Sequence, residues 1–339
     1  MKLDWKSALG IVVSAALLWW TLRGVALHDV WMVLTKSNAL LFALSVVLAT
    51  IIFPLRARRW RTILEPVVGR VAFGPLWRST AIGIMMNNVF PARAGEFGRA
   101  FALSREVPSV PMSTALGSLA VDRIFDAIVL FALMFGAMLA PGFPSDVTFY
   151  GQTVAQLAGG GMIAIGGLLI VCYAVVLQPD RVLAIVGALV RRVAPKFEQP
   201  IARFVKHAVG GLAVLKDARR FLAVLFWALL HWLVYALSIY VGFLAVGIHV
   251  PFTAALFVQG VVAIGVAFPS SPGFVGVFEL ASTLGLAVYG VPKELALSWA
   301  LAYHGLSFIP ITAMGAVYFA RLGMSAGSLT KRDAGAPSP

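Results

Sequence analysis

Long apolar runs are the feature that most limits what this chain can fold into. Segment 153–177 contains no charged residue, and similar runs cover about 7–23, 38–55, 113–140, 221–247 and 294–320. An α-helix needs roughly 17–25 apolar residues to cross a ~30 Å hydrocarbon core, so each run is long enough to span a membrane. Of the 339 residues, 60% are apolar and 12% are charged, whereas soluble domains carry about 25% charged residues. We therefore expect an all-α polytopic membrane protein with about six full spans.

The net charge of +13 does not indicate a nucleic-acid partner. Basic residues form short clusters between the apolar runs, as in RARRWR (56–61) and in the segment 178–220, whereas 141–152 has no Lys or Arg. Such clusters are typical of cytoplasmic loops next to anionic lipid. The pattern predicts a bacterial cytoplasmic membrane protein with both termini in the cytoplasm.

The polar segments outside the spans have simpler interpretations. Segment 178–220 mixes basic and apolar residues at near-helical spacing, which suits helices lying in the inner interface or a linker between two halves. The residues 323–339 are small, polar and rich in Pro and Gly, so we expect a disordered tail. Cys172 lies in an apolar run and predicts a core thiol rather than a disulfide or a metal ligand.

Two further apolar regions, 76–105 and 252–290, are broken in the middle by polar residues, glycines and prolines. The first contains MMNNVFPARAGEFGRAF and the second contains VAFPSSPGFVGVFELA. With the orientation above, the first must enter and leave from the cytoplasmic face and the second from the outer face. We therefore predict two re-entrant helical hairpins, and an inverted-topology repeat with a first half at 1–150 and a second half at 151–322.

Each break can serve a polar ligand. Proline removes a backbone donor and glycine allows close approach, so the freed N–H groups at the start of a half-helix suit an anion such as a lipid phosphate. Charged side chains inside a bundle are costly unless they are paired or line a solvated path. We predict substrate contacts from Asn87, Asn88, Arg93, Glu96, Arg99, Asp122, Arg123, Asp126, Ser270, Ser271, Gly273, Glu279 and His304.

Several of these residues also have a structural interpretation. Glu96 and Arg99, three positions apart, suit an ion pair that locks the hairpin as well as they suit transport. Asp122 suits a helix cap, and His304 suits a hydrogen-bonded core histidine. The arginines of the first break suit membrane anchors, and the two asparagines suit partners for broken backbone.

The motifs together resemble the lysylphosphatidylglycerol synthase transmembrane region. NNVFPARAGEFGRAFAL, DRIFD, FPSSPGFVGVFE and AYHGLSFIP carry this resemblance, which runs from about residue 8 to 322. It includes a G-E-x-x-R element (Gly95, Glu96, Arg99) and a P-G-x-x-G-x-x-E element (Pro272, Gly273, Gly276, Glu279). The resemblance implies a lipid translocase that moves a polar headgroup between leaflets. Bifunctional members of the family carry a soluble aminoacyl-transfer domain after the membrane part, which this sequence does not show.

We expect a lipid flippase in which Arg93 and Arg99 hold an anion in a polar cavity near mid-membrane and carboxylates balance the charge. The headgroup would be anionic or aminoacylated. Membrane lipids and lipid-synthesis enzymes are the expected partners, no cofactor or metal is expected, and dimerisation is left open. This interpretation predicts no enzymatic activity. The alternatives are an intramembrane enzyme acting on a lipid phosphate or polyprenyl donor, with Ser270 or Ser271 as nucleophile, and a scaffold of a lipid-synthesis complex.

Overall fold

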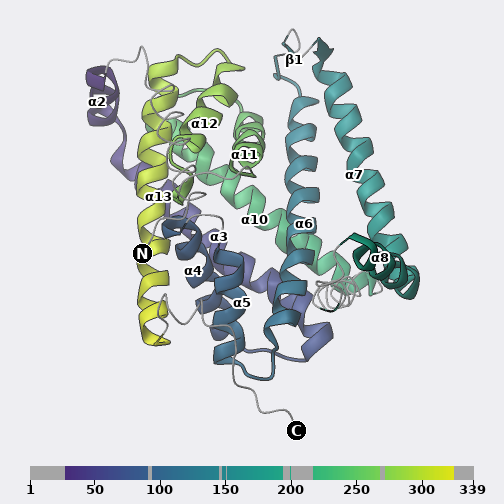
Figure 1. The fold of residues 1–339 in the computed structure, drawn as a ribbon. Helices are drawn as coiled ribbons and strands as arrows, with labels where there is room; N and C mark the ends of the chain where they lie inside the picture. The colour runs from purple at the N-terminus through teal and green to yellow at the C-terminus, as the bar shows by residue number, and fades with distance from the viewer. Residues whose placement is uncertain are drawn as a thin grey trace.

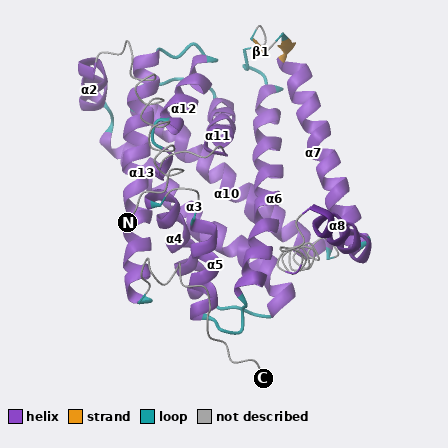
Figure 2. Ribbon diagram, in the orientation of Figure 1, coloured by secondary structure: helices purple, strands orange, loops and turns teal. Residues whose placement is uncertain are grey.

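The protein is built almost entirely from α-helices, as the sequence predicts (Figure 2). The computed structural model describes residues 27–90, 94–144, 147–149, 151–193, 199, 217–267 and 272–323. The first predicted span at 7–23 and all but the first residue of the predicted tail at 323–339 lie outside these residues.

The described elements of the first half are α2 (Leu27–Lys36), α3 (Ala39–Val68), α4 (Phe73–Val89), α5 (Gly95–Glu106) and α6 (Met112–Met138). A short two-stranded sheet follows, made of β1 (Thr148–Phe149) and β2 (Gln152–Thr153). The remaining elements are α7 (Val154–Leu177), α8 (Pro179–Val193), α10 (Ala218–Ala245), α11 (Phe252–Ala267), η3 (Pro272–Phe274), α12 (Val277–Ala287) and α13 (Lys293–Arg321).

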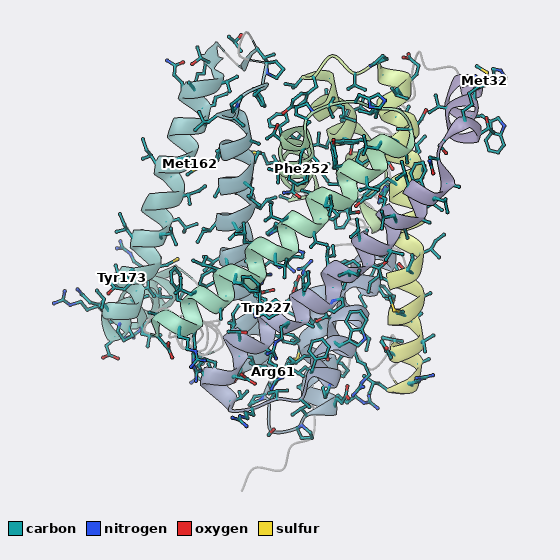
Figure 3. All side chains as sticks on the ribbon, turned by 180° about the vertical axis from the view of Figure 1, so that it is seen from behind. Met32, Arg61, Met162, Tyr173, Trp227 and Phe252 are labelled. Carbon is teal, nitrogen blue, oxygen red and sulfur yellow. The ribbon has the colours of Figure 1, made fainter. Side chains whose placement is uncertain are left out.

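Four described helices are long and apolar enough to cross a membrane, namely α3, α7, α10 and α13. Helices α7, α10 and α13 match predicted spans closely, whereas α3 begins where predicted and continues beyond the predicted end. A further predicted span, 113–140, corresponds to α6, which is 27 residues long but carries Asp122, Arg123 and Asp126 in its middle. The chain is therefore a multi-pass membrane protein, whereas the total of six spans stays a prediction. The outward-facing side chains agree with a lipid environment: on α7, at the edge of the bundle in Figure 3, Met162 is 42% and Tyr173 54% exposed.

The first broken region is a helical hairpin. Helix α4 ends at Val89, and α5 begins at Gly95 and packs back against it. A Cβ added at Gly83 would lie 2.7 Å from the carbonyl oxygen of Gly95, and one added at Gly95 would lie 2.5 Å from Asn87 Cγ. The two helices therefore run antiparallel at a separation that only glycine permits.

The second broken region forms a hairpin of the same kind. Helix α11 packs against α12, with Gly265 facing Ala281 and Gly285 facing Val258. Between them η3 turns the chain through Gly273, whose φ is +68°. Neither broken region is a continuous rod. In Figure 1, α4 and α5 lie in the lower half of the molecule and α11 and α12 in the upper half, so the hairpins occupy opposite ends of the bundle.

Helices α3 and α10 form the long diagonal pair at the centre (Figures 1 and 3). They run antiparallel and are joined by reciprocal hydrogen bonds: Ser45 Oγ donates to the Ser238 carbonyl at 2.8 Å, and Ser238 Oγ donates to the Ser45 carbonyl at 2.8 Å. The amide of Asn38 also donates to the carbonyl of Ala245. Because both serines are fully buried, these bonds fix the register of the pair.

The packing partners of the two halves correspond. In each half a long helix (α3 or α10) packs on its own hairpin, and the second arm of the hairpin packs on the next helix (α6 or α13). Across the halves, α4 packs on α13 and α11 packs on α6. An internal repeat would give this exchange pattern, so the predicted inverted repeat, and with it the division at residue 150, agrees with the packing but stays a prediction.

The connecting segments contain two findings. The loop predicted at 141–152 contains the unpredicted antiparallel pair β1–β2, in which Thr148 lies opposite Thr153. The segment predicted at 178–220 begins with α8, which has Arg181 in its first turn and Arg191 and Arg192 in its last. Figure 1 places the α6–β1 loop and the α12–α13 loop at one end of the bundle, and the α5–α6 loop and the end of α13 at the other.

Candidate functional site

The basic motif RARRWR is part of a membrane helix and not the loop that the sequence predicts. Helix α3 continues to Val68, which corrects the predicted end of this span at 55. Within it Arg59 is fully buried and the Arg56 side chain is 11% exposed. A helix continues here because no residue between 55 and 68 breaks it except Pro66, near its end. Arg56 and Arg59, three positions apart, therefore share the face that packs into the bundle.

Two aspartates on α6 receive these arginines. Arg59 donates from Nε to Asp122 Oδ1 at 2.7 Å and from Nη1 to Asp126 Oδ1 at 2.6 Å. Arg56 Nη2 lies 3.6 Å from Asp126 Oδ2. Asp122 is thus in the interior of α6, about 15 Å along the helix from its first residue. The interpretation of Asp122 as a helix cap is wrong, because α6 begins ten positions earlier.

The first hairpin adds two charged side chains that contact the same part of α6. From α5, Arg99 Nη1 lies 3.5 Å from Asp122 Oδ2, and Glu96 pairs with Arg123. Arg123 also donates to Asp126 Oδ2 at 3.1 Å. The predicted Glu96–Arg99 pair does not describe the contacts: the two side chains each reach α6 and hold the hairpin to that helix.

Aromatic side chains surround the charges. The Arg99 guanidinium lies over the Trp60 ring, 4.1 Å from its centroid, and Trp60 Nε1 donates to Ser118 Oγ at 2.8 Å. From α10, Trp232 Nε1 donates to Asp126 Oδ1 at 3.1 Å. His231 Nδ1 lies 4.0 Å from the same oxygen. We call the set that these contacts connect the charged cluster: Arg56, Arg59, Trp60, Glu96, Arg99, Ser118, Asp122, Arg123, Asp126, His231 and Trp232.

The charged cluster has more donors than its acceptors satisfy. Four guanidinium groups face three carboxylates, so one positive charge is not balanced. In the described part of the protein, the buried atoms without a hydrogen-bond partner include Nε and Nη2 of Arg56, Nη2 of Arg59, and Nε and Nη2 of Arg99. Buried donors without partners are costly, so a group that supplies acceptors would be stabilised here.

The second hairpin contains a separate polar cluster. Glu279 accepts from the Gly276 amide at 2.6 Å through Oε2, and its Oε1 lies 2.7 Å from His304 Nδ1 on α13. The Phe278 ring lies 4.4 Å from the His304 ring, centroid to centroid. Glu279 is 2% exposed and caps α12, so this pair ties the tip of the second hairpin to α13.

The two hairpin tips meet. Asn87 Oδ1 accepts from the Gly95 amide at 2.8 Å, which satisfies backbone freed by the first break. Asn88 Nδ2 donates to Thr312 on α13 at 2.8 Å, and a Cβ added at Gly273 would lie 3.4 Å from the Asn88 carbonyl oxygen. The Asn87 bond is the contact that the structural interpretation predicts, and Asn88 and Gly273 lie where the halves touch.

The remaining predictions concern site residues outside the described part of the chain, a metal site and a polar cavity. Arg93, Ser270 and Ser271 lie outside the described residues. Among the described residues, no group of three or more His, Cys, Asp or Glu side chains could hold a metal. A groove of about 530 Å³ between α3 and α13 is mostly apolar and lies apart from both clusters; it is lined by Ser37, Ala39, Phe42, Ala43, Val46, Val47 and Leu306. The polar cavity near mid-membrane stays a prediction.

Six members of the charged cluster were not predicted from the sequence: Arg56, Arg59, Trp60, Ser118, His231 and Trp232. Arg56, Arg59 and Trp60 were interpreted as a basic loop, although their i, i+3, i+4 spacing is the signal of one helical face. Trp232 and His231 lie in an apolar run without a motif. Only the packing of α10 against α3 and α6 brings these two side chains to Asp126.

The family is shown by the sequence itself. The family model described as the lysylphosphatidylglycerol synthase TM region matches residues 7–315. The chain belongs to this family. The predicted resemblance is confirmed, and the match includes both hairpins and every member of the charged cluster.

Individual relatives are distant and differ in length. Glycosyltransferase AglD of Haloferax volcanii is 28% identical over 323 residues, covering 85% of this chain and 50% of that protein. A UPF0104 membrane protein of Methanothermobacter thermautotrophicus is 25% identical over 330 residues, covering 94% of this chain and 93% of its own. A second one from the same organism is 26% identical over 312 residues, covering 86% and 87%. The chain spans about half the length of the Haloferax relative.

The prediction that the chain has no enzymatic activity is contradicted by the name of one of its relatives. It treats the family's membrane region as separate from enzymes, whereas one relative that aligns over most of this chain is named a glycosyltransferase. The coarser conclusion stands: this is a membrane protein of a family with lipid-related functions.

Proposed function

We propose that this protein moves the polar headgroup of a membrane lipid between the two leaflets, in a bacterial cytoplasmic membrane. The single observation that carries the proposal is the charged cluster. It lies inside a bundle of membrane helices and includes Glu96 and Arg99 from α5, the second arm of the first hairpin. Ionisable residues within membrane helices mark substrate or ion pathways by default, because placing them there is costly.

The arrangement of the hairpins supports transport over a purely structural role. Broken helices of opposite orientation that meet at a substrate site are common in transporters with inverted repeats. Here the two tips touch through Asn88 and Gly273, and each hairpin is bonded to a helix of the bundle through a carboxylate, Asp122 or Glu279. Movement of one half against the other would open a path past the charged cluster, alternately to each side.

Leaflet exchange in proteoliposomes tests this function. Purified protein is reconstituted with a panel of fluorescent lipids that differ in headgroup, and the fraction accessible to a membrane-impermeant quencher is followed with time. We expect exchange of at least one polar lipid to be faster than in empty liposomes. Asp126→Asn should slow that exchange at least tenfold, because Asp126 orients Arg59, Trp232 and Arg123 together.

Arg61→Gln is the matched control. Arg61 lies on the same helix as Arg56 and Arg59, but its side chain is 26% exposed and pairs with Glu65 on its own helix. Exchange should be unchanged in this variant. Exchange equal to that of empty liposomes across the whole lipid panel would contradict the proposal, as would equal exchange by the wild type and Asp126→Asn.

The name of the Haloferax relative favours a second candidate function. A protein named a glycosyltransferase, half of which aligns with this chain, suggests that the bundle binds a lipid-linked sugar or a lipid phosphate as an acceptor or donor. The chain would then present the lipid to glycosyl transfer. Incubation of the protein with lipid phosphate and labelled nucleotide sugar tests this: label in the lipid fraction supports the second function, and exchange without label supports the first.

A further inference from the structure

Arg99 and Arg56 have the same guanidinium edge without a hydrogen-bond partner. In both residues Nε and Nη2 are the buried atoms without a hydrogen-bond partner in the described part of the protein. These two nitrogens lie on one edge of the planar guanidinium, the edge that binds carboxylates and phosphates through two parallel N–H···O bonds. Arg99 reaches Asp122 through Nη1, which is not part of this edge. Arg56 Nη2 lies 3.6 Å from Asp126 Oδ2, an ion pair longer than a hydrogen bond.

The two aspartates nearby already accept hydrogen bonds from other groups. Both Asp126 oxygens already accept, Oδ1 from Arg59 and Trp232 and Oδ2 from Arg123. Asp122 accepts from Arg59 through Oδ1 and from Arg99 through Oδ2. Within the described part of the chain, the charged cluster therefore holds both aspartates in place and leaves five buried guanidinium nitrogens without a hydrogen-bond partner, against one carboxylate oxygen, Glu96 Oε2. This excess of donors over acceptors is the composition of an anion site.

Arg99 is also held rigidly. Its guanidinium stacks on Trp60, which is fixed by the bond from its Nε1 to Ser118, and its side chain is only 3% exposed. A guanidinium fixed in plane and direction loses less entropy on binding an oxyanion than a mobile one. The neighbouring Glu96–Arg123 pair is the exposed side of the cluster, with side chains 29% and 43% exposed, so an anion can approach there by displacing that pair.

We propose that the Nε–Nη2 edge of Arg99 binds a phosphate oxyanion, with the corresponding edge of Arg56 as the second ligand group in the same cluster. The source of the phosphate is the headgroup of a phospholipid or lipid phosphate, which rests on the proposed function; free inorganic phosphate offers the same chemistry. This assignment gives Arg56 the role that the sequence suggested for Arg93.

Binding to purified protein tests the site without any transport. Protein in detergent is titrated by calorimetry with four probes: dihexanoyl phosphatidic acid, dihexanoyl phosphatidylglycerol, dihexanoylglycerol and inorganic phosphate. We expect at least one phosphate-bearing lipid to bind and dihexanoylglycerol not to bind. Arg99→Gln should weaken lipid binding roughly tenfold or more, because a bond to a charged group and the bidentate geometry are both lost.

Three variants complete the experiment. Arg99→Lys keeps the charge but not the fork, so its affinity should fall between those of the wild type and Arg99→Gln. Arg56→Gln should also weaken binding, and it provides the test if Arg99→Gln does not fold. Arg61→Gln should bind as the wild type does. Equal affinity for dihexanoylglycerol, or unchanged lipid binding in both Arg99→Gln and Arg56→Gln, would overturn the site.

The outcomes separate the site from transport. Phosphate-dependent binding that both arginine variants weaken, together with no leaflet exchange, would support the anion site and contradict the flippase. Binding of inorganic phosphate alone would support the oxyanion chemistry and overturn the lipid source. Leaflet exchange that does not change in Arg99→Gln and Arg56→Gln would leave transport standing and overturn the site.

Discussion

Arg59 is the residue on which the charged cluster depends. It is 0% exposed and bonds both Asp122 and Asp126, so each aspartate is oriented by the same guanidinium. Taking such charges out of water is expensive, and their pairing offsets the cost only while every partner is present. At this scale the structure explains why a chain with few charged residues places seven of them against one another.

Arg59→Leu should lower the free energy of unfolding by about 3–5 kcal/mol, because it leaves two buried carboxylates without their shared partner. Arg61→Leu should change it by no more than about 0.5 kcal/mol, since Arg61 is partly exposed and pairs only within its own helix. Denaturation of both variants in detergent, with wild-type protein alongside, measures the difference. Equal stability of the two variants would show that the cluster does not contribute to the fold.

At the scale of elements, the first hairpin depends on close contact between its two arms. The hairpin positions Arg99 for Asp122 because Gly95 and Gly83 allow α5 to approach α4. A side chain at either glycine would push α5 outward and carry Arg99 away from Trp60. The helical break therefore matters mainly because it sets the direction of α5, and less because it removes backbone hydrogen bonds.

Gly95→Ala should destabilise the protein by about 1–3 kcal/mol, the usual effect of overpacking. The added Cβ would lie 2.5 Å from Asn87 Cγ and also press on the Gly83 carbonyl. Gly160→Ala on α7 is the control, since nothing lies within 4 Å of its added Cβ. It should be neutral or stabilising by up to about 1 kcal/mol, as in other helices. A thermal scan in detergent that places Gly95→Ala at or above the wild type would contradict the close packing.

The sequence predicts elements well because long apolar runs and Pro-Gly breaks act locally. Apart from the end of α3, the described spans and both hairpins lie where hydropathy and the two motifs place them. The charged cluster was predicted only in part. The end of a span is predicted from where the apolar run stops, whereas α3 continues past that point because its basic residues pack into the bundle. In the sequence Arg59 belongs to a predicted basic loop, and only the packing of α3 against α6 brings it to Asp122 and Asp126. Trp232 belongs to no motif, and only the packing of α10 against α6 brings it to Asp126.

At the scale of the whole molecule, the two hairpins and the two sets of loops divide between opposite ends of the bundle. The distribution of basic residues predicts which end faces the cytoplasm: the loop at 141–152 should be outside and the start of α10 inside. This orientation also decides from which side each hairpin enters the membrane.

Cysteine labelling of whole cells measures that orientation. With the buried Cys172 replaced by Ser, Gly142→Cys should react with an impermeant maleimide added to intact cells. Arg219→Cys, at the start of α10, should react only after the cells are permeabilised. Both positions are exposed, so access through the membrane decides the result. The reverse pattern would invert the topology, and labelling of both in intact cells would contradict the predicted spans.

Lipid transport through the proposed anion site requires that a headgroup binds inside the bundle at the guanidinium edges of Arg99 and Arg56. An experimental structure of the protein in nanodiscs containing the lipid that it binds best measures this directly. We expect density for a phosphate within hydrogen-bond distance of Arg99 Nε and Nη2, with the acyl chains leaving between helices. A lipid phosphate bound only at the outer surface of the helices, with those two nitrogens satisfied by protein oxygens, would contradict it.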